Sequence, residues 1–281
     1  IYNMADMYFI GFLNDYTQVA AVSLIMPVFS IMTAVSMLLG NGGCTLIAQA
    51  LGAGEKKRAR SYMSLCIWTA ILLGVIIAGL IIVFSNPLLK FLGTNEEMWQ
   101  YARNYMLILA VGSPAMLLNY TIACLVRGEG VIKPGLIANF VSTGMNILWD
   151  PVLILGVKMG VSGAALATVL SNVIGIVYLI WDTMHHEMIL TFNPKPARES
   201  VRHLGRVFAL GFPNAISNIL NGFASTFSNQ LLVLYGTSAV AAMAAAGKAT
   251  MIVGLLQMGL CMGVQPLMAY YYGAGDMRRI E

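Results

Sequence analysis

The chain has 281 residues, of which 58% are hydrophobic and only 10% are charged, and its formal net charge is +4. Soluble domains carry about 25% charged residues, so this composition excludes an ordinary soluble protein. The long uncharged stretches predict an all-α integral membrane protein, because helices satisfy their own backbone hydrogen bonds in lipid. We expect no nucleic-acid partner, since membrane topology accounts for the basic residues. The sequence holds no phosphate-binding loop, paired-histidine metal motif or nucleophile elbow, so we expect neither an enzyme nor a bound cofactor.

Apolar stretches long enough to cross a bilayer, about 20 residues each, recur along the chain. They predict eight spans, near residues 1–13, 19–48, 62–85, 101–126, 133–155, 160–183, 206–235 and 239–271. The first span is short because the sequence opens inside an apolar segment, without a Met and without a basic leader. We therefore do not interpret the opening as a signal peptide, and we expect a natural start to be missing.

Basic residues fall mainly on one side of this arrangement. Of the 16 Lys and Arg residues, 12 lie in or beside the segments 52–60, 127–133, 184–205 and 273–281. Because cytoplasmic segments of membrane proteins carry an excess of Lys and Arg, we expect these segments and the N-terminus to be cytoplasmic.

Two aspartates lie inside predicted spans, where an ionisable group is costly and usually functional. One is Asp6; the other is Asp150, within a run that is apolar for most of a membrane thickness. Asn146 precedes Asp150 by four residues, so both side chains share one helix face. Pro151 cannot donate an N–H, so the carbonyl of Ile147 loses its helical partner. A carboxylate, an amide oxygen and a free carbonyl are therefore expected in one place.

The predicted topology puts these polar groups at a similar depth. Asp6, Asp150 and Thr168 lie about seven, five and eight residues from the outer ends of their spans, a difference within one helical turn. Tyr2 shares the helix face of Asp6. Carboxylate, amide and hydroxyl oxygens suit a hard cation such as Na⁺, and two close carboxylates in a low dielectric can hold one proton instead. The alternative is a buried hydrogen-bond cluster that holds the helices together.

The sequence also contains an internal repeat. A shift of 221 residues aligns the segment Gly52–Glu55 with Gly273–Asp276, and Arg58 with Arg279. Across residues 1–60, 14 positions are then identical without a gap. Biased apolar composition is the alternative explanation, but the matched Gly-Ala-Gly-acid-x-x-Arg motif favours gene duplication.

In this repeat the first span pairs with the seventh and the second with the eighth, so each repeat holds six spans. An even number of spans gives both repeats the same orientation, as in parallel repeats. We predict an N-terminal lobe at 1–184, a cytoplasmic linker at 185–205 and the start of a C-terminal lobe at 206–281. The second repeat stops after two spans, so we expect about four spans to be absent and a chain ending here to be inactive alone.

Motifs in four places resemble the multidrug and toxic compound extrusion (MATE) family. They are Met-x-Asp-Met-Tyr-Phe-Ile-Gly over 4–11, Val-Ala-Ala-Val-Ser over 19–23, Gln-x-x-Gly-Ala-Gly-Glu over 49–55, and Asn146-x-x-x-Asp150-Pro151 followed by GVSGAALATVLSN. Their order along the chain also matches, and the resemblance covers about eight of the twelve spans of the family.

The resemblance implies a secondary antiporter with two six-helix lobes around a cavity that opens alternately to each side. Inward flow of Na⁺ or H⁺ would drive export of small amphipathic, often cationic, compounds. The cation site of the family maps onto Asp6, Asn146, Asp150 and Thr168, with Tyr2 as a weaker neighbour. The uncharged seventh span points to the DinF-like branch. We expect a monomer in the bacterial inner membrane, with membrane lipids and small-molecule substrates as its partners.

Two further residues are candidates for the substrate cavity. Lys248 lies about ten residues into the eighth span, where a buried ammonium is costly; the alternative is that it snorkels towards a surface. Pro27 can bend the second span near the proposed cation site. A flippase for a lipid-linked oligosaccharide or precursor is the alternative function, but it would need a more cationic cavity. An ion channel would need a polar stripe along a whole span, and we find none in the sequence.

Overall fold

The computed structural model describes residues 9–10, 16–185, 201–233 and 237–279, with many side chains between 222 and 255 outside the description. The described residues contain helices and no strand, which confirms the all-α prediction. Most of the predicted first span and of the predicted linker lie outside these residues. The elements are α2 (Tyr16–Gly52), α3 (Lys56–Val83), α4 (Ser85–Phe91), α5 (Glu96–Gly128), α6 (Lys133–Asp150), the π-helix η1 (Pro151–Gly156), α7 (Val161–His185), the 3₁₀ turn η2 (Val201–His203), α9 (Leu204–Val233), α10 (Thr237–Ala274) and the 3₁₀ turn η3 (Met277–Arg279).

Four of the described helices are long and apolar enough to cross a membrane by length and composition. They are Thr17–Gly52, Lys56–Val83, Glu96–Gly128 and Val161–His185. Much of their apolar surface faces outwards: Val83 is 72% exposed and Val111 is 70% exposed. In a soluble protein such a surface would drive aggregation, whereas in a bilayer it contacts lipid tails. The chain is therefore a multi-pass membrane protein.

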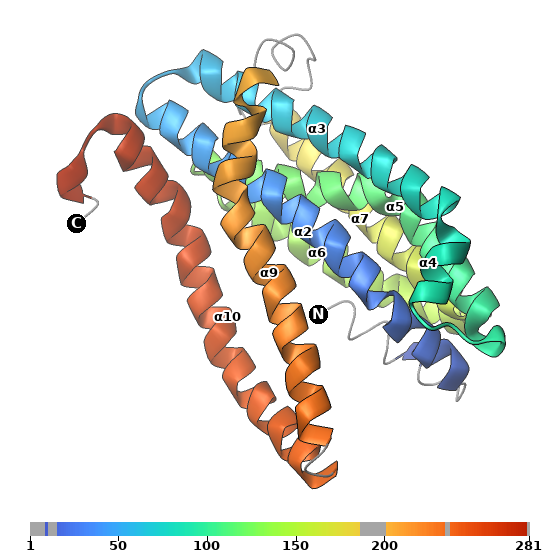
Figure 1. Ribbon diagram of the computed structural model, residues 1–281. Helices are drawn as coiled ribbons and strands as arrows, with labels where there is room; N and C mark the ends of the chain where they lie inside the picture. The colour runs from blue at the N-terminus through green and yellow to red at the C-terminus, as the bar shows by residue number, and fades with distance from the viewer. Residues whose placement is uncertain (1–8, 11–15, 186–200, 234–236, 280–281) are drawn as a thin grey trace.

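Helix α2 is the element that joins the two parts of the structure. It packs against α3 and α5 on one side and against α9 and α10 on the other. Figure 1 shows α2–α7 as one bundle and α9–α10 as a hairpin that leads away from it. We call the end where α2 ends and α3 begins the basic end, because it also holds the basic segments beside α5, α6, α9 and α10. At this end α10 lies near α2, and towards its N-terminus α10 moves away from α2 (Figure 1).

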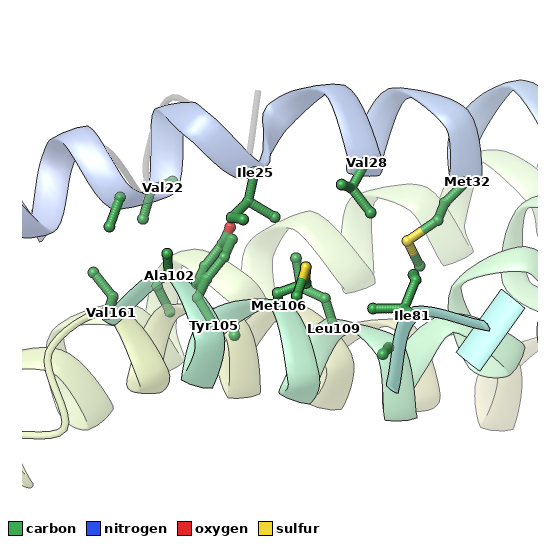
Figure 2. Close-up of a cluster of buried hydrophobic side chains, with 14 of the residues drawn as sticks. Val22, Ile25, Val28, Met32, Ile81, Ala102, Tyr105, Met106, Leu109 and Val161 are labelled. Carbon is green, nitrogen blue, oxygen red and sulfur yellow. The ribbon is translucent and has the colours of Figure 1, made fainter. Parts of the chain in front are cut away.

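Two buried apolar clusters hold the α2–α7 bundle together. In the cluster away from the basic end, Val22, Ile25 and Met32 of α2 point towards the neighbouring helices, whose labelled side chains include Ile81 of α3 and Tyr105 of α5 (Figure 2). The cluster nearer the basic end joins α2, α3, α5, α7 and α9, and its fully buried side chains include Leu39, Ile47, Met63, Ile67, Ile122 and Leu125. The level between the two clusters is polar, and it contains the cavity described below.

The α-helix that contains the predicted site changes type at Pro151. Helix α6 ends at Asp150, and residues Pro151–Gly156 form a π-helical stretch. The N–H of Val157 donates to the carbonyl of Val152 at 2.8 Å, a bond between residues five apart. Pro151 has no N–H to continue the α-helical pattern, which accounts for a break at this position. The sequence analysis expected Pro151 to deprive the Ile147 carbonyl of its partner; the structure shows a change to a π-helix at this proline, which was not expected.

Substitution of Gly74 tests the close crossing of α3 and α5. A Cβ at Gly74 would lie 2.5 Å from the Cα of Pro114, and Ser113 Oγ donates to the Gly74 carbonyl at 2.9 Å. We expect Gly74→Ala to lower the free energy of unfolding by about 1–3 kcal/mol, because backbone atoms cannot move aside cheaply. Thermal unfolding in detergent would measure this. Gly79→Ala on the same helix is the control, since a Cβ there meets nothing within 4 Å; equal melting temperatures for the two variants would contradict the prediction.

Candidate functional site

Three of the predicted site residues lie buried in the α2–α7 bundle. Asn146 and Asp150 are on α6 and Thr168 is on α7, and none of them is more than 1% exposed. Asn146 Nδ2 donates to Thr168 Oγ1 at 3.4 Å, so the two helices meet through these side chains. Asn146 Oδ1 is buried and accepts no hydrogen bond from a described residue. The amide therefore presents an acceptor oxygen on the face that it shares with Asp150.

A polar contact near this site joins α7 to α2. Gln18, in the first turns of α2, accepts a hydrogen bond from the backbone N–H of Val161 at 3.1 Å. Val161 is the first residue of α7, where backbone N–H groups have no partner within the helix. Gln18 thus caps α7 and ties its start to α2, two turns before Thr168.

The remaining predicted site residues are less well placed by the structure. Asp6 and Tyr2 lie outside the described residues, so their contact with Asp150 stays a prediction. Lys248 lies on α10, but its side chain is also outside the description. Pro27 lies inside α2 and is exposed. The proposed roles of Lys248 and Pro27 in a substrate cavity therefore stay predictions.

A polar cavity of about 240 Å³ lies beside the candidate site, at the level between the two apolar clusters. Asn119 Nδ2 donates to Asn172 Oδ1 at 3.0 Å and to Ser142 Oγ at 3.5 Å. Asn172 Nδ2 in turn donates to the Thr168 carbonyl at 2.7 Å. A network of hydrogen bonds therefore runs from Asn146 through Thr168 to Asn119, and connects α5, α6 and α7.

The sequence analysis did not identify this network. Its signal was present in part: Ser142 precedes Asn146 by four residues, and Asn172 follows Thr168 by four, so each extends a polar helix face. Asn119 stands alone in an apolar stretch of α5, and its two partners are 23 and 53 residues away in sequence. Only the fold shows that these side chains meet.

A second cavity, of about 410 Å³, lies between α2, α9 and α10. Two hydrogen bonds at this cavity join the hairpin to α2. Asn218 Nδ2 of α9 donates to Met37 Sδ, and Gln265 Nε2 of α10 donates to Thr45 Oγ1, both at 3.0 Å. Among the described residues that line it, none carries a charge. The lining consists of Met37, Asn41, Asn214, Ser217, Asn218, Asn221, Met258, Cys261, Met262 and Gln265.

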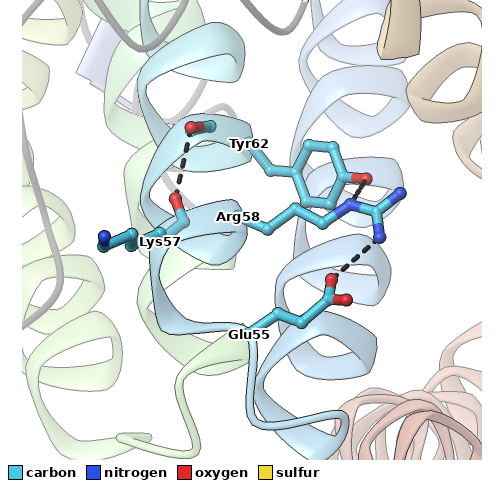
Figure 3. Close-up of polar contacts among 5 residues, drawn as sticks. Glu55, Lys57, Arg58 and Tyr62 are labelled. Atoms are coloured by element: carbon cyan, nitrogen blue, oxygen red, sulfur yellow. Dashed lines mark hydrogen bonds and ion pairs between the residues drawn. The ribbon is translucent and has the colours of Figure 1, made fainter.

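At the basic end, Arg58 contacts Glu55, the residue just before α3, and Tyr62, one turn further along the helix. Arg58 Nη1 pairs with Glu55 Oε2 at 2.8 Å, and Arg58 Nε donates to Tyr62 Oη at 2.9 Å (Figure 3). The side chains of Arg58 and Glu55 are 45% and 47% exposed. An ion pair this exposed contributes little to the free energy of unfolding. We therefore interpret it as a contact that orients the side chains at this end.

The chain belongs to the MATE family. The MatE family model matches residues 1–152 and 213–281, which together cover most of the chain. The multidrug export protein MepA of Staphylococcus aureus is 33% identical over 278 residues, covering 99% of this chain and 62% of the relative. MepA of Staphylococcus haemolyticus is 32% identical over 279 residues, with the same coverage. The chain thus spans 62% of the length of these curated relatives.

Solved structures confirm the MATE-like fold. A crystal structure of MATE in the bent conformation matches with a TM-score of 0.91 at 26% identity. A MOP superfamily transporter from Pyrococcus furiosus matches with a TM-score of 0.88, also at 26% identity. Both alignments cover 99% of this chain and 62% of the other. The names of these relatives describe transporters rather than enzymes, in agreement with the expectation from the sequence.

Asn119→Ala tests whether the hydrogen-bond network holds the bundle together. Loss of this amide leaves the polar groups of Ser142 and Asn172 without their partner, so we expect the free energy of unfolding to fall by about 1–3 kcal/mol. Asn139→Ala is the matched control, because Asn139 Nδ2 donates only to the Gly135 carbonyl of its own helix. Thermal unfolding of both variants in detergent measures the difference. If Asn139→Ala proves as destabilising as Asn119→Ala, the network contributes no stability of its own.

Proposed function

We propose that the protein carrying this chain is a secondary active antiporter that exports small amphipathic compounds, including cationic ones. Influx of Na⁺ or H⁺ drives export, and two lobes open the central cavity alternately to each side of the membrane. The observation that carries this proposal is the fully buried Asp150, grouped with Asn146 and Thr168 inside a membrane-embedded bundle. The names of the MepA relatives, which describe multidrug export, support the choice of cargo.

The coupling cation binds at Asp6, Asn146, Asp150 and Thr168, with Tyr2 beside them. Asp150 supplies negative charge, while Asn146 Oδ1 and Thr168 Oγ1 supply neutral oxygens of the kind that Na⁺ prefers. Burial of a carboxylate favours its neutralisation, either by a bound cation or by a proton. Occupancy of the site changes the packing of the first span and so shifts the balance between the two states. A shift of this kind needs a few kcal/mol of differential affinity.

The substrate occupies the cavity between α2, α9 and α10, with Lys248 and Pro27 as further candidate contacts. Its amide side chains offer hydrogen bonds to varied polar groups, and its methionines adapt their shape to different apolar surfaces. The described lining is free of charge. A flippase for a pyrophosphate-linked precursor would require several cationic groups in this place, and Lys248 is the one basic residue deep in these two predicted spans, which favours an exporter of amphipathic molecules.

The basic end faces the cytoplasm of a bacterium, and the protein is a monomer in the inner membrane with its N-terminus inside. The excess of Lys and Arg in the segments at this end supports that orientation. On this orientation Asp150, at the far end of α6, lies in the outer half of the membrane. A cation therefore reaches the site from the outside, as influx requires.

Replacement of Asp150 tests the coupling. We expect Asp150→Asn to reduce gradient-driven efflux of a fluorescent cationic dye from energised vesicles about 5- to 150-fold, because the variant cannot change its charge state. Na⁺ and pH gradients are imposed separately, so the gradient that drives wild-type efflux names the coupling ion. The matched control is Asp182→Asn. It removes a second buried carboxylate, which lies on α7 about four turns nearer to the basic end than Thr168.

Three outcomes are informative. Loss of efflux in Asp150→Asn but not in Asp182→Asn supports the coupling site. Unchanged efflux in Asp150→Asn overturns it. Wild-type efflux that ignores both gradients overturns the antiporter itself and favours the flippase.

A further inference from the structure

The basic ends of α2 and α10 touch through backbone atoms at two glycines. A Cβ built on Gly52 of α2 would clash with the carbonyl oxygen of Tyr270 and lie 2.8 Å from its carbonyl carbon. A Cβ built on Gly273 of α10 would clash with the carbonyl oxygen of Gln49 and lie 2.7 Å from its carbonyl carbon. Such distances are far shorter than any contact that a real Cβ makes. This approach of the two helices is therefore available only to glycine.

The contact follows the internal repeat. Gly52 and Gly273 are separated by 221 residues (273 − 52), and Gln49 and Tyr270 by the same 221 (270 − 49). Gly52 thus meets the carbonyl of the residue three positions before Gly273, and Gly273 meets the carbonyl of the residue three positions before Gly52. The two contacts are reciprocal, as expected for helices related by a local two-fold axis along the membrane normal.

Other close contacts between α2 and the α9–α10 hairpin lie in the same half of α2. A Cβ on Gly42 would clash with the Val207 carbonyl, and one on Gly211 would clash with the Leu38 carbonyl. All four glycine contacts thus involve α2 between residues 38 and 52. Towards the opposite end, the hairpin moves away from the bundle (Figure 1). Backbone contacts thus join the helices near the basic end, whereas the described glycines further along α10, Gly254, Gly259 and Gly263, would place a Cβ with nothing within 4 Å.

The described ion pairs at this end do not join α2 to α10. The described pairs at this end, Arg58 with Glu55 at 2.8 Å and Arg279 with Asp276 at 3.4 Å, each join residues three apart in one repeat. They occupy equivalent positions of the two repeats and leave the junction between the helices to backbone atoms. Between the helices lies a cavity of about 290 Å³, lined on its two sides by Gln49 and Tyr272 among others.

We propose that Gly52 and Gly273 are the positioning residues of the cytoplasmic closure, and that a side chain at either one shifts the transporter towards its inward-open state. This inference rests on the alternating access of the proposed function. The closed state needs the two helix ends in backbone contact, whereas the inward-open state separates them and tolerates a Cβ. The glycines therefore stabilise one state of the cycle relative to the other, because only the closed state excludes a methyl group.

Distances between spin labels test the proposal. Labels are attached at Lys57→Cys in the first turn of α3 and at Met277→Cys in η3, just after α10, after replacement of the four native cysteines by serine or alanine. Both positions are exposed. Pulsed electron paramagnetic resonance in lipid nanodiscs then reports the distance, without substrate or gradient. We expect Gly52→Ala and Gly273→Ala each to raise the ratio of long to short distances about 5- to 30-fold. In the double variant we expect little more, since one methyl group already prevents the contact.

Gly263→Ala is the matched control. It makes the same change on the same α10 helix, at a glycine whose Cβ would meet nothing within 4 Å, so its distances should equal those of the wild type. Distances that stay short in both Gly52→Ala and Gly273→Ala overturn the proposal, and so does an equal lengthening in Gly263→Ala.

The wild type provides a second measurement in case the variants do not fold. Changing Na⁺ concentration and pH should interconvert short and long distances between the same labels. A single short distance under every condition overturns the proposed opening at this contact. Because no transport is measured, the result is independent of the efflux assay: lengthening in the glycine variants with unchanged efflux in Asp150→Asn would retain the closure and reject the cation site.

Discussion

Polar groups inside the α2–α7 bundle must find their partners within the protein, because the surrounding hydrocarbon offers none. This constraint explains why Asn119, Ser142 and Asn172, which lie on three different helices, are joined by hydrogen bonds. Asn119 of α5 donates to Asn172 of α7, Asn172 donates to the Thr168 carbonyl of its own helix, and Asn146 of α6 donates to the Thr168 hydroxyl. In the proposed function, Asp150 holds the coupling cation together with Asn146 and Thr168.

Helix α2 connects the region of the candidate site with the α9–α10 hairpin. Its first turns cap α7 through Gln18, close to the candidate site, and its last turns contact α10 at Gly52. One continuous helix of 37 residues therefore spans from the level of the cation site to the closed basic end. In the proposed cycle, a change in packing at one end of α2 acts on the contact at the other. Pro27 lies between these two ends, at a position where helices bend readily.

Sequence reasoning identified features that depend on short separations along the chain. Asn146 and Asp150 share a face because they are four residues apart, and the structure buries both. The break at Pro151 followed from its missing N–H, although whether the chain would form a kink, a loop or a π-helix depends on packing. Asn119 was missed because its partners lie on other helices. The contact at Gly52 was missed for a similar reason: the repeat showed that Gly52 and Gly273 correspond, but only the fold brings each against the carbonyl of the other helix.

The reciprocal glycine contact has the form of an isologous interface, in which one surface meets a copy of itself across a two-fold axis. In a homodimer both halves of such an interface have the same sequence, so every substitution changes the interface at two places. In the gene duplication that the sequence repeat favours, fusion of two copies into one polypeptide would remove that restriction, so Gly52 and Gly273 could diverge separately. The residues around them have already done so, since Gln49 stands where the second copy has Tyr270. On this interpretation the two repeats keep the same backbone contact while the side chains around it differ, so substitutions could alter one side of the contact without altering the other.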